Sequence, residues 1–289
     1  MSVRHVLLPE RVLIVTETPA LRRLRELPAE YRVRGVESWS ELAAAMAQAS
    51  PASAVLADPY MERRLADGPS PELRRAIVQH PSVPVIAAMR IRPDRAEHAS
   101  TLLLEWEVSD ILNLNLHRSL EGVEQALRAV RARPLKRLVE PLLTEFASEN
   151  ARNLVRGACE VAVEGGAAPE LAAIFRVDPR TVTAWCRREG LPPPRRLLAW
   201  TRVLLAAMML RETGRSVVNV ARATGYATDH ALRRAMRDLF AGGPATLERD
   251  KLFPHAADRF RRELREMRDR ARERRRDLRS SRSRPRLAE

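Results

Sequence analysis

Runs of consecutive apolar residues, each followed by a helix-like segment, recur along the first 135 residues and restrict what this part of the chain can form. Four runs are RVLIV (11–15), SAVLAD (53–58), VPVIAAM (83–89) and SDILNL (109–114), and a shorter strand over 31–36 fits between the first two. Strands that are apolar on both faces are typical of a parallel sheet covered by helices on both sides. Residues 1–135 are therefore predicted to form an α/β domain.

Helices are expected after four of these strands. The segments with a helical pattern are PALRRLREL (19–27), PELRRAIVQH (71–80), residues 94–106 and SLEGVEQALRAVRAR (119–133). In the last segment Ser119 is a suitable N-cap, and Glu121 and Glu124 follow in the first turns.

The strand pattern ends at Pro134. Helical segments then continue to residue 250, with breaks at 165–166, 190–194, 214, 225 and 242–244. This arrangement predicts a helical linker over 136–149, an all-α domain over 150–250 and a tail over 251–289. The tail begins as a helix with Phe260, Leu264, Met267 and Ala271 on one face, and it ends in the Arg-rich stretch ERRRDLRSSRSRPRLAE.

Positive charge is concentrated in the second half of the chain. The net charge is +14; residues 1–135 hold 18 Arg and Lys against 17 Asp and Glu, residues 136–250 hold 18 against 13, and residues 251–289 hold 15 against 7. A neutral front and a basic back favour a polyanionic partner for the back. Because acidic membranes also attract basic surfaces, the motifs have to decide between the two.

The stretch SVVNVARATGYATDHALRRAMRDLF (216–240) has the pattern of a helix-turn-helix. Its first helix is short and is expected to have Val217, Val218, Val220 and Ala221 on its apolar face. Gly225 suits a left-handed turn, and Thr228 suits the N-cap of the second helix. The spacing of Leu232, Met236 and Leu239 predicts a buried face there, so that the outward-facing residues are Asp229, His230, Arg233, Arg234 and Arg237.

A second copy of this pattern lies 49 residues upstream, in PELAAIFRVDPRTVTAWCRRE (169–189). Leu171-Ala172 occupies the place of Val220-Ala221, and Asp178 followed by Pro179 is a strong helix start. Val182, Trp185 and Cys186 are expected inside, and the outward-facing residues are Arg180, Thr181, Thr183, Arg187 and Arg188. The long helical segment between the copies would hold two reading helices in successive major grooves, roughly 34 Å apart.

Residues 150–249 resemble the DNA-binding domain of the AraC/XylS family of bacterial transcription regulators. The resemblance rests on the linker segment with Arg202, Ala206 and Leu210, on SVVNVARATGYATDHALRRAM, and on the closing GGP that ends at Pro244. It implies contacts to bases or phosphates from Arg180, Thr183 and Ala184 in the first reading helix and from Asp229, His230, Arg233 and Arg234 in the second. The chain departs from the family at Leu232, Met236, Ala241 and Leu247-Glu248, and Ala184 at a contact position predicts weak base specificity for the first helix.

Residues 11–133 resemble the receiver domain of two-component response regulators, which implies a flavodoxin-like fold. Asp58 aligns with the phosphoacceptor, and Glu17 is what remains of the acidic cluster that would hold magnesium in an active receiver. Met89 stands where a switching Ser or Thr is expected, and Leu114 or Asn115 stands in place of the lysine. The front domain is therefore interpreted as a pseudo-receiver for dimerisation or partner binding, and phosphorylation of Asp58 is the open alternative.

The sequence contains no signature of an enzyme, a cofactor site or a metal site. GxGxxG, phosphate-loop, GxSxG and HExxH patterns are absent, the six histidines are scattered, and Cys159 and Cys186 lack metal-ligand spacing. The longest apolar runs are too short for a bilayer, and the N-terminus lacks a signal-peptide pattern. A cytoplasmic, non-enzymatic protein without a cofactor is expected.

These patterns predict a sequence-specific transcription regulator that binds double-stranded DNA through reading helices at about 179–189 and 229–240. RNA polymerase is a candidate partner, a homodimer through the front domain is a candidate assembly, and no membrane association is expected. The alternatives are an architectural protein that coats DNA by charge and a response regulator that uses Asp58. Deleting residues 255–289 is expected to flatten the salt dependence of DNA binding and to leave the choice of site unchanged.

Overall fold

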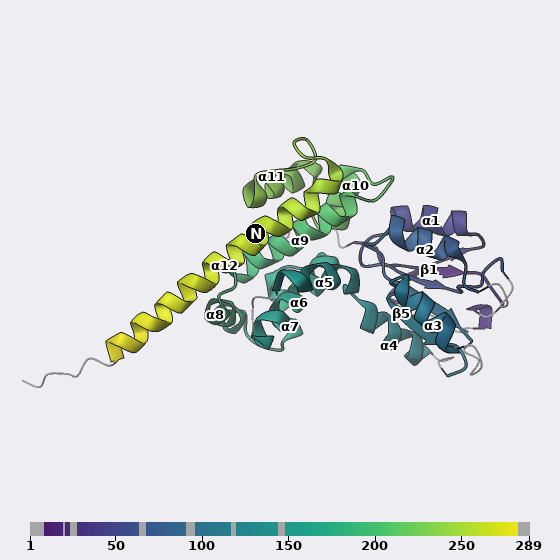
Figure 1. The fold of residues 1–289 in the computed structure, drawn as a ribbon, viewed down its shortest axis with the longest axis horizontal. Helices are drawn as coiled ribbons and strands as arrows, with labels where there is room; N and C mark the ends of the chain where they lie inside the picture. The colour runs from purple at the N-terminus through teal and green to yellow at the C-terminus, as the bar shows by residue number, and fades with distance from the viewer. Residues whose placement is uncertain are drawn as a thin grey trace, which may run out of the picture.

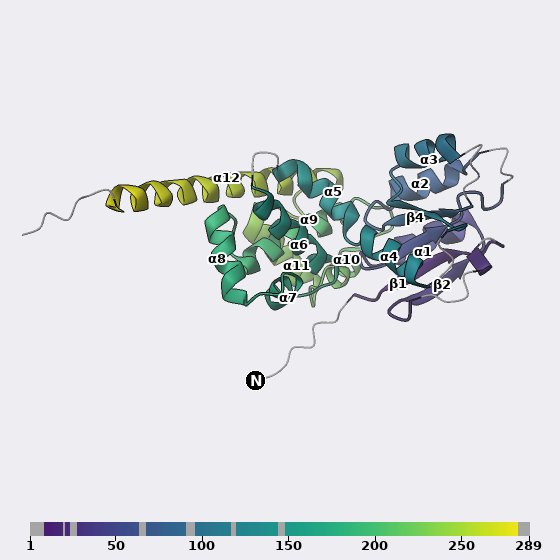
Figure 2. The same ribbon diagram turned by 90° about the horizontal axis from the view of Figure 1, so that it is seen from below.

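The computed structural model describes residues 9–19, 21–23, 28–63, 68–90, 96–116, 120–143 and 148–282. These residues form an α/β front domain and a helical back domain, and a long last helix projects from the back domain away from the front one (Figure 1). The same arrangement is seen from below in Figure 2. Within the described residues, no helix is both long enough and apolar enough to cross a bilayer.

The front domain contains one parallel sheet of five strands. The strands are β1 (Val12–Thr16), β2 (Arg32–Val36), β3 (Ala54–Ala57), β4 (Val85–Met89) and β5 (Asp110–Asn113). Their order is β2-β1-β3-β4-β5, with Leu13 paired to Ala54 and Val55 to Val85. This is the strand order of flavodoxin-like folds, so the predicted fold class of the front domain is confirmed.

Helices cover both faces of the sheet. α1 (Trp39–Gln48), α2 (Pro71–Gln79) and α3 (Ala96–Glu105) lie on one face, where they pack on Ile14, Val55 and Ala87. α4 (Leu120–Val130) lies on the other face and packs on residues such as Leu13 and Leu56. Burial of successive residues on opposite faces explains why β1, β3 and β4 read as uninterrupted apolar runs, whereas β2, at the edge of the sheet, is mostly exposed.

Two parts of the front domain differ from the sequence-based expectation. The helix predicted over 19–27 is, in its described part, a 3-10 turn at Leu21–Arg23, and residues 20 and 24–27 lie outside the described residues, as do 94, 95 and Ser119. The sequence analysis also missed α1, although Ser38 caps it by accepting a hydrogen bond from the amide of Glu41 (3.2 Å). Because α1 has one charged residue, it lacks the polar stripe that marks an amphipathic helix.

The back domain is helical throughout. Its elements are α5 (Arg133–Val139), the 3-10 helix η3 (Glu140–Leu143), α6 (Glu149–Val163), α7 (Ala168–Ile174), α8 (Pro179–Glu189), α9 (Pro194–Leu210), α10 (Val217–Ala223), α11 (Asp229–Phe240) and α12 (Arg249–Arg282). One hydrophobic core joins them, and α9 runs through its centre with both faces buried.

The last helix, α12, is a core element over its first half. Leu252, Phe260 and Leu264 are fully buried in the same core as the other helices. Phe260 lies against Trp200 of α9, with ring centroids 5.3 Å apart, and Glu263 accepts a hydrogen bond from Trp200 Nε1 (3.0 Å). The basic helical tail that the sequence predicts therefore begins inside the helical domain.

Candidate nucleic-acid interface

The two predicted reading helices, α8 and α11, begin with the caps that the sequence predicts. Asp178 accepts a hydrogen bond from the amide of Arg180 (2.7 Å), and Pro179 occupies the first position of α8. Thr228 accepts one from the amide of Ala231 (3.1 Å) at the start of α11. Both side chains satisfy amides that would otherwise lack partners at a helix start.

The turns before the two reading helices have the same hydrogen bonds at an offset of 49 residues. The amide of Val177 donates to the carbonyl oxygen of Ala172 (3.1 Å), and the amide of Tyr226 donates in the same way to that of Ala221 (2.8 Å). One residue earlier, Arg176 and Gly225 both bond to the carbonyl three residues before them (3.0 and 3.1 Å). The α7–α8 and α10–α11 segments are therefore two copies of one helix-turn-helix unit.

A left-handed residue occupies the same place in both turns. Gly225 has φ +79°, and at the equivalent place Arg176 has φ +53°, a conformation that costs a side-chain-bearing residue roughly 1–2 kcal/mol. Glycine is the residue that adopts this conformation without steric conflict.

The Arg176→Gly variant is expected to be more stable than the wild type by about 0.5–1 kcal/mol, because part of the gain is offset by the greater flexibility of glycine in the unfolded chain. Urea denaturation measures the difference. Arg187→Gly, inside α8, is the matched control and should lose about 1 kcal/mol. An equal loss at both positions would mean that the left-handed turn carries no strain.

The inner faces of the units pack as predicted, with one exception. Val182 and Cys186 of α8, like Leu232 and Met236 of α11, have at most 1% of their surface exposed. The prediction that Val218 lies on the apolar face of the short helix is wrong, because 46% of this side chain is exposed. α10 is only seven residues long, and its buried residues, Val220 and Ala221, are enough to pack it against the core.

The outward-facing residues of α8 lie on an open surface. Arg180, Thr183, Ala184 and Arg187 are exposed, and Thr181 is half-buried. The hydroxyl of Thr183 donates to the carbonyl oxygen of Pro179 (3.0 Å), so its side chain is turned back onto its own helix. The guanidinium groups of Arg180 and Arg187 are left as long cationic groups of this face, and Arg188 is exposed as well and pairs with Glu189 (3.0 Å).

The outward-facing residues of α11 include two ion pairs within the helix. Arg233 pairs with Asp229 (3.4 Å), both half-buried, and Arg234 pairs with Asp238 (3.7 Å), both well exposed. His230 and Arg237 are exposed. The sequence analysis missed the role of Asp238, although its spacing four residues after Arg234 is the signal for such a pair.

The front domain leaves these faces uncovered, and α12 crosses the C-terminal ends of both reading helices. His255 Nε2 lies 3.1 Å from the carbonyl oxygen of Phe240, the last residue of α11. Further along α12, the backbone of Arg268 lies against Gly190, the C-cap residue of α8. A Cβ added to Gly190 would be 2.8 Å from the Cα of Arg268. Thirteen residues separate the two contact points, which is about 20 Å along the axis of an α-helix. One helix therefore supports both units: it starts beside α10 and runs along the back domain away from the sheet (Figure 1).

This geometry agrees with the comparison to known proteins. Residues 171–250, from α7 to the start of α12, match the model of a family described as a helix-turn-helix domain. They form an AraC-type helix-turn-helix domain. No curated protein and no solved structure matches this chain. The AraC-type domain covers both helix-turn-helix units and the helix α9 between them, and the match does not extend to the front domain.

In the front domain, the two carboxylates of the predicted phosphorylation site have different partners. Asp58 Oδ1 accepts a hydrogen bond from the amide of Tyr60 (3.0 Å), while the amide of Asp58 donates to the buried hydroxyl of Thr16 (2.8 Å). Glu17 is exposed and pairs with Arg22 (3.5 Å). Within the described ranges, no three His, Cys, Asp or Glu side chains are grouped so that they could hold a metal ion.

The two cysteines are part of the core. Cys159 on α6 and Cys186 on α8 are free and buried, and burial raises the pKa of each thiol to about 12. A thiol with such a pKa remains protonated at neutral pH and is a poor nucleophile or metal ligand. Their positions are explained by packing.

Proposed function

We propose that the protein is a sequence-specific transcription regulator that binds double-stranded DNA with α8 and α11 in successive major grooves. The observation that carries this proposal is the pair of helix-turn-helix copies, each with an exposed basic reading helix, held on one rigid frame of α9 and α12. A helix of this kind places arginine side chains where they can form paired hydrogen bonds to guanine.

We infer that the front domain of this regulator is a signal-input or dimerisation module. Asp58 is already bonded to the turn after β3, and Glu17 pairs with Arg22, which favours a pseudo-receiver over a phosphorylated receiver. The front domain also leaves the outward faces of α8 and α11 exposed, so it does not regulate DNA binding by covering the reading helices.

The Arg234→Ala variant tests the reading role of α11. Its affinity for the preferred DNA site is expected to fall by roughly 1–3 kcal/mol and its affinity for random DNA to change little, because a base contact is lost. Fluorescence anisotropy on both duplexes, at one salt concentration, measures the two losses. The preferred duplex is obtained by selection of the wild-type chain on random DNA.

Arg74→Ala is the matched control, since it removes the same charge from an exposed position on α2 of the front domain. It should leave both affinities within about twofold of the wild type, as expected for one distant and screened charge. An equal loss on selected and random DNA in Arg234→Ala would instead support an architectural protein that binds DNA by charge.

A further inference from the structure

The front domain contacts the two helix-turn-helix units at equivalent places. One contact is the turn after α6, at Glu164–Gly166, which leads into the first unit. The other is the turn after α9, residues 211–216, which leads into the second. The offset of 49 residues that relates the units pairs Gly165 with Gly214, and both have a positive φ, +69° and +81°.

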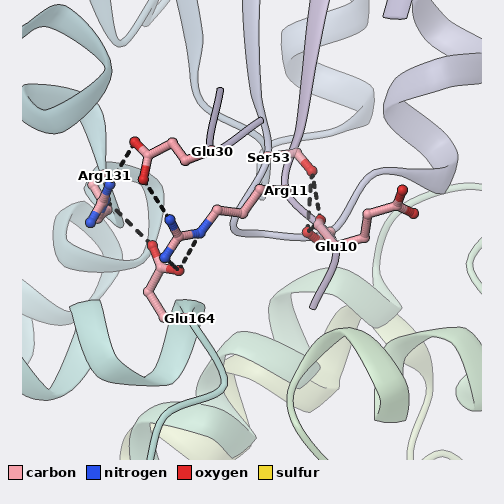
Figure 3. A network of polar contacts seen from close by, with 7 residues as sticks. Glu10, Arg11, Glu30, Ser53, Arg131 and Glu164 are labelled. Atoms are coloured by element: carbon pink, nitrogen blue, oxygen red, sulfur yellow. Dashed lines mark hydrogen bonds and ion pairs between the residues drawn. The ribbon is translucent and has the colours of Figure 1, made fainter. Parts of the chain in front are cut away.

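The contact to the first unit is a cluster of four charged side chains (Figure 3). We call it the Glu164 cluster, and its members are Arg11, Glu30, Arg131 and Glu164. Arg11, at the start of β1, donates to Glu164 Oε2 from Nε (2.8 Å) and Nη2 (2.5 Å). Arg131, just after α4, lies 3.4 Å from the other oxygen of Glu164. The four side chains are 20–43% exposed, and a cavity of about 690 Å³ adjoins them, so water and salt reach the cluster.

The contact to the second unit is fully buried. Glu212 accepts a hydrogen bond from the amide of Ser82 (2.8 Å), in the loop before β4, and pairs with Arg215 (2.9 Å). Arg215 in turn donates to the carbonyl oxygens of Ala49 (2.6 Å) and Met46 (3.1 Å) at the end of α1. Side-chain exposure of the pair is 2% or less.

The two units also touch each other beside the Glu164 cluster. A Cβ at Gly225, in the turn of the second unit, would lie 3.3 Å from the Cα of Gly165. Arg202 of α9 donates to the carbonyl oxygens of Gly165 (3.2 Å) and Gly166. Because Glu164 is the residue before this contact, the front domain holds the place where the two units meet.

We propose that the front domain controls DNA binding by bracing the two helix-turn-helix units through their leading turns, with Glu212–Arg215 as the permanent anchor and the Glu164 cluster as the contact that opens. The difference in burial assigns these roles. A partly exposed ion pair is weakened by solvent and salt, whereas breaking a buried one leaves a charge without its partner. This inference rests on the proposed function, since it names how the front domain acts on the DNA-binding units.

Hydrogen–deuterium exchange of the full chain tests the opening contact. Glu164→Gln and Arg11→Ala are each expected to speed exchange at 164–166 about tenfold while leaving 46–49 and 212–216 unchanged. The double variant should equal Glu164→Gln alone, because that change already removes the charge with which Arg11 pairs. Arg32→Ala is the matched control. Arg32 pairs with Glu10 (3.0 Å) in the same domain and is 78% exposed, and none of the described ion pairs joins it to the back domain.

A second measurement connects the opening to DNA. The probes are the duplex that the wild-type chain selects from random DNA and the same duplex with one half-site scrambled. Glu164→Gln is expected to bind the intact duplex about tenfold more weakly and the scrambled one with unchanged affinity, since bracing helps when both units are engaged.

Unchanged exchange at 164–166, or an intact-duplex affinity that stays constant or rises while exchange speeds up, would overturn the brace. If the wild-type chain selects no consensus at all, the proposed function fails. The exchange measurement then still decides whether the Glu164 cluster is the contact that opens.

Discussion

The Glu212→Ala variant is expected to be less stable than the wild type by about 3–5 kcal/mol, because breaking a buried ion pair leaves one charge without a partner. Glu212 is fully enclosed, and its loss would leave the guanidinium of Arg215 and the amide of Ser82 without their carboxylate. Chemical denaturation of the full chain measures the loss. Glu248→Ala is the matched control, since Glu248 pairs with Lys251 at 2.6 Å on the surface and should cost at most about 1 kcal/mol.

The Glu212–Arg215 pair also predicts how the stability difference between the wild type and Glu212→Ala depends on pH. Burial raises the pKa of Glu212. The nearby His80 ring (Nδ1 at 3.9 Å), the charge of Arg215 and the hydrogen bonds from Ser82 and Arg215 outweigh it, so that the pKa lies below its ordinary value of 4.5. A lowered carboxyl pKa stabilises the fold above the pKa of the unfolded chain and ceases to do so as the pH falls through the folded pKa. The advantage of the wild type over Glu212→Ala should therefore be complete at neutral pH and shrink below pH 4.5. A loss no larger than that of Glu248→Ala would contradict the anchoring role.

The Phe260→Ala variant is expected to lose about 3–5 kcal/mol, because a fully buried aromatic ring is removed and a cavity is left in the core. Phe260 has no exposed surface and lies against Trp200 at the centre of the back domain. Thermal and urea denaturation measure the loss, and far-UV circular dichroism follows the helical content. The result decides whether α12 is part of the domain or an appendage.

Arg270→Ala, on the exposed side of the same helix, is the control and should change stability by less than about 0.5 kcal/mol. Equal and small losses in both variants would mean that α12 packs loosely. The structure also corrects the expectation for deletion of residues 255–289. That deletion removes Phe260 and Leu264 from the core together with the hydrogen bond of His255 to α11, so it should unfold the DNA-binding units as well as remove charge.

The features that sequence analysis predicted well are those set by local pattern. Asp178 and Thr228 cap the reading helices as predicted, because capping depends on residues within one turn. β1, β3 and β4 were visible because burial on both faces leaves a continuous apolar run. Sequence analysis missed α1, whose amphipathic pattern is weak, and it wrongly placed Val218 on the buried face of α10, where packing against neighbouring helices decides which residues are buried.

The sequence by itself determined two helix-turn-helix copies, a parallel sheet and a basic back half, since each follows from periodicity, caps and charge within short segments. Tertiary structure alone decided that α12 supports both units, that Glu17 pairs with Arg22 and lies against Gly35, and that Glu164 and Glu212 join the front domain to equivalent turns. The partners in these contacts lie far apart in the chain, 153 residues for Arg11 and Glu164 and 130 for Ser82 and Glu212. No local pattern specifies such pairs, because they form when two separately folded surfaces meet.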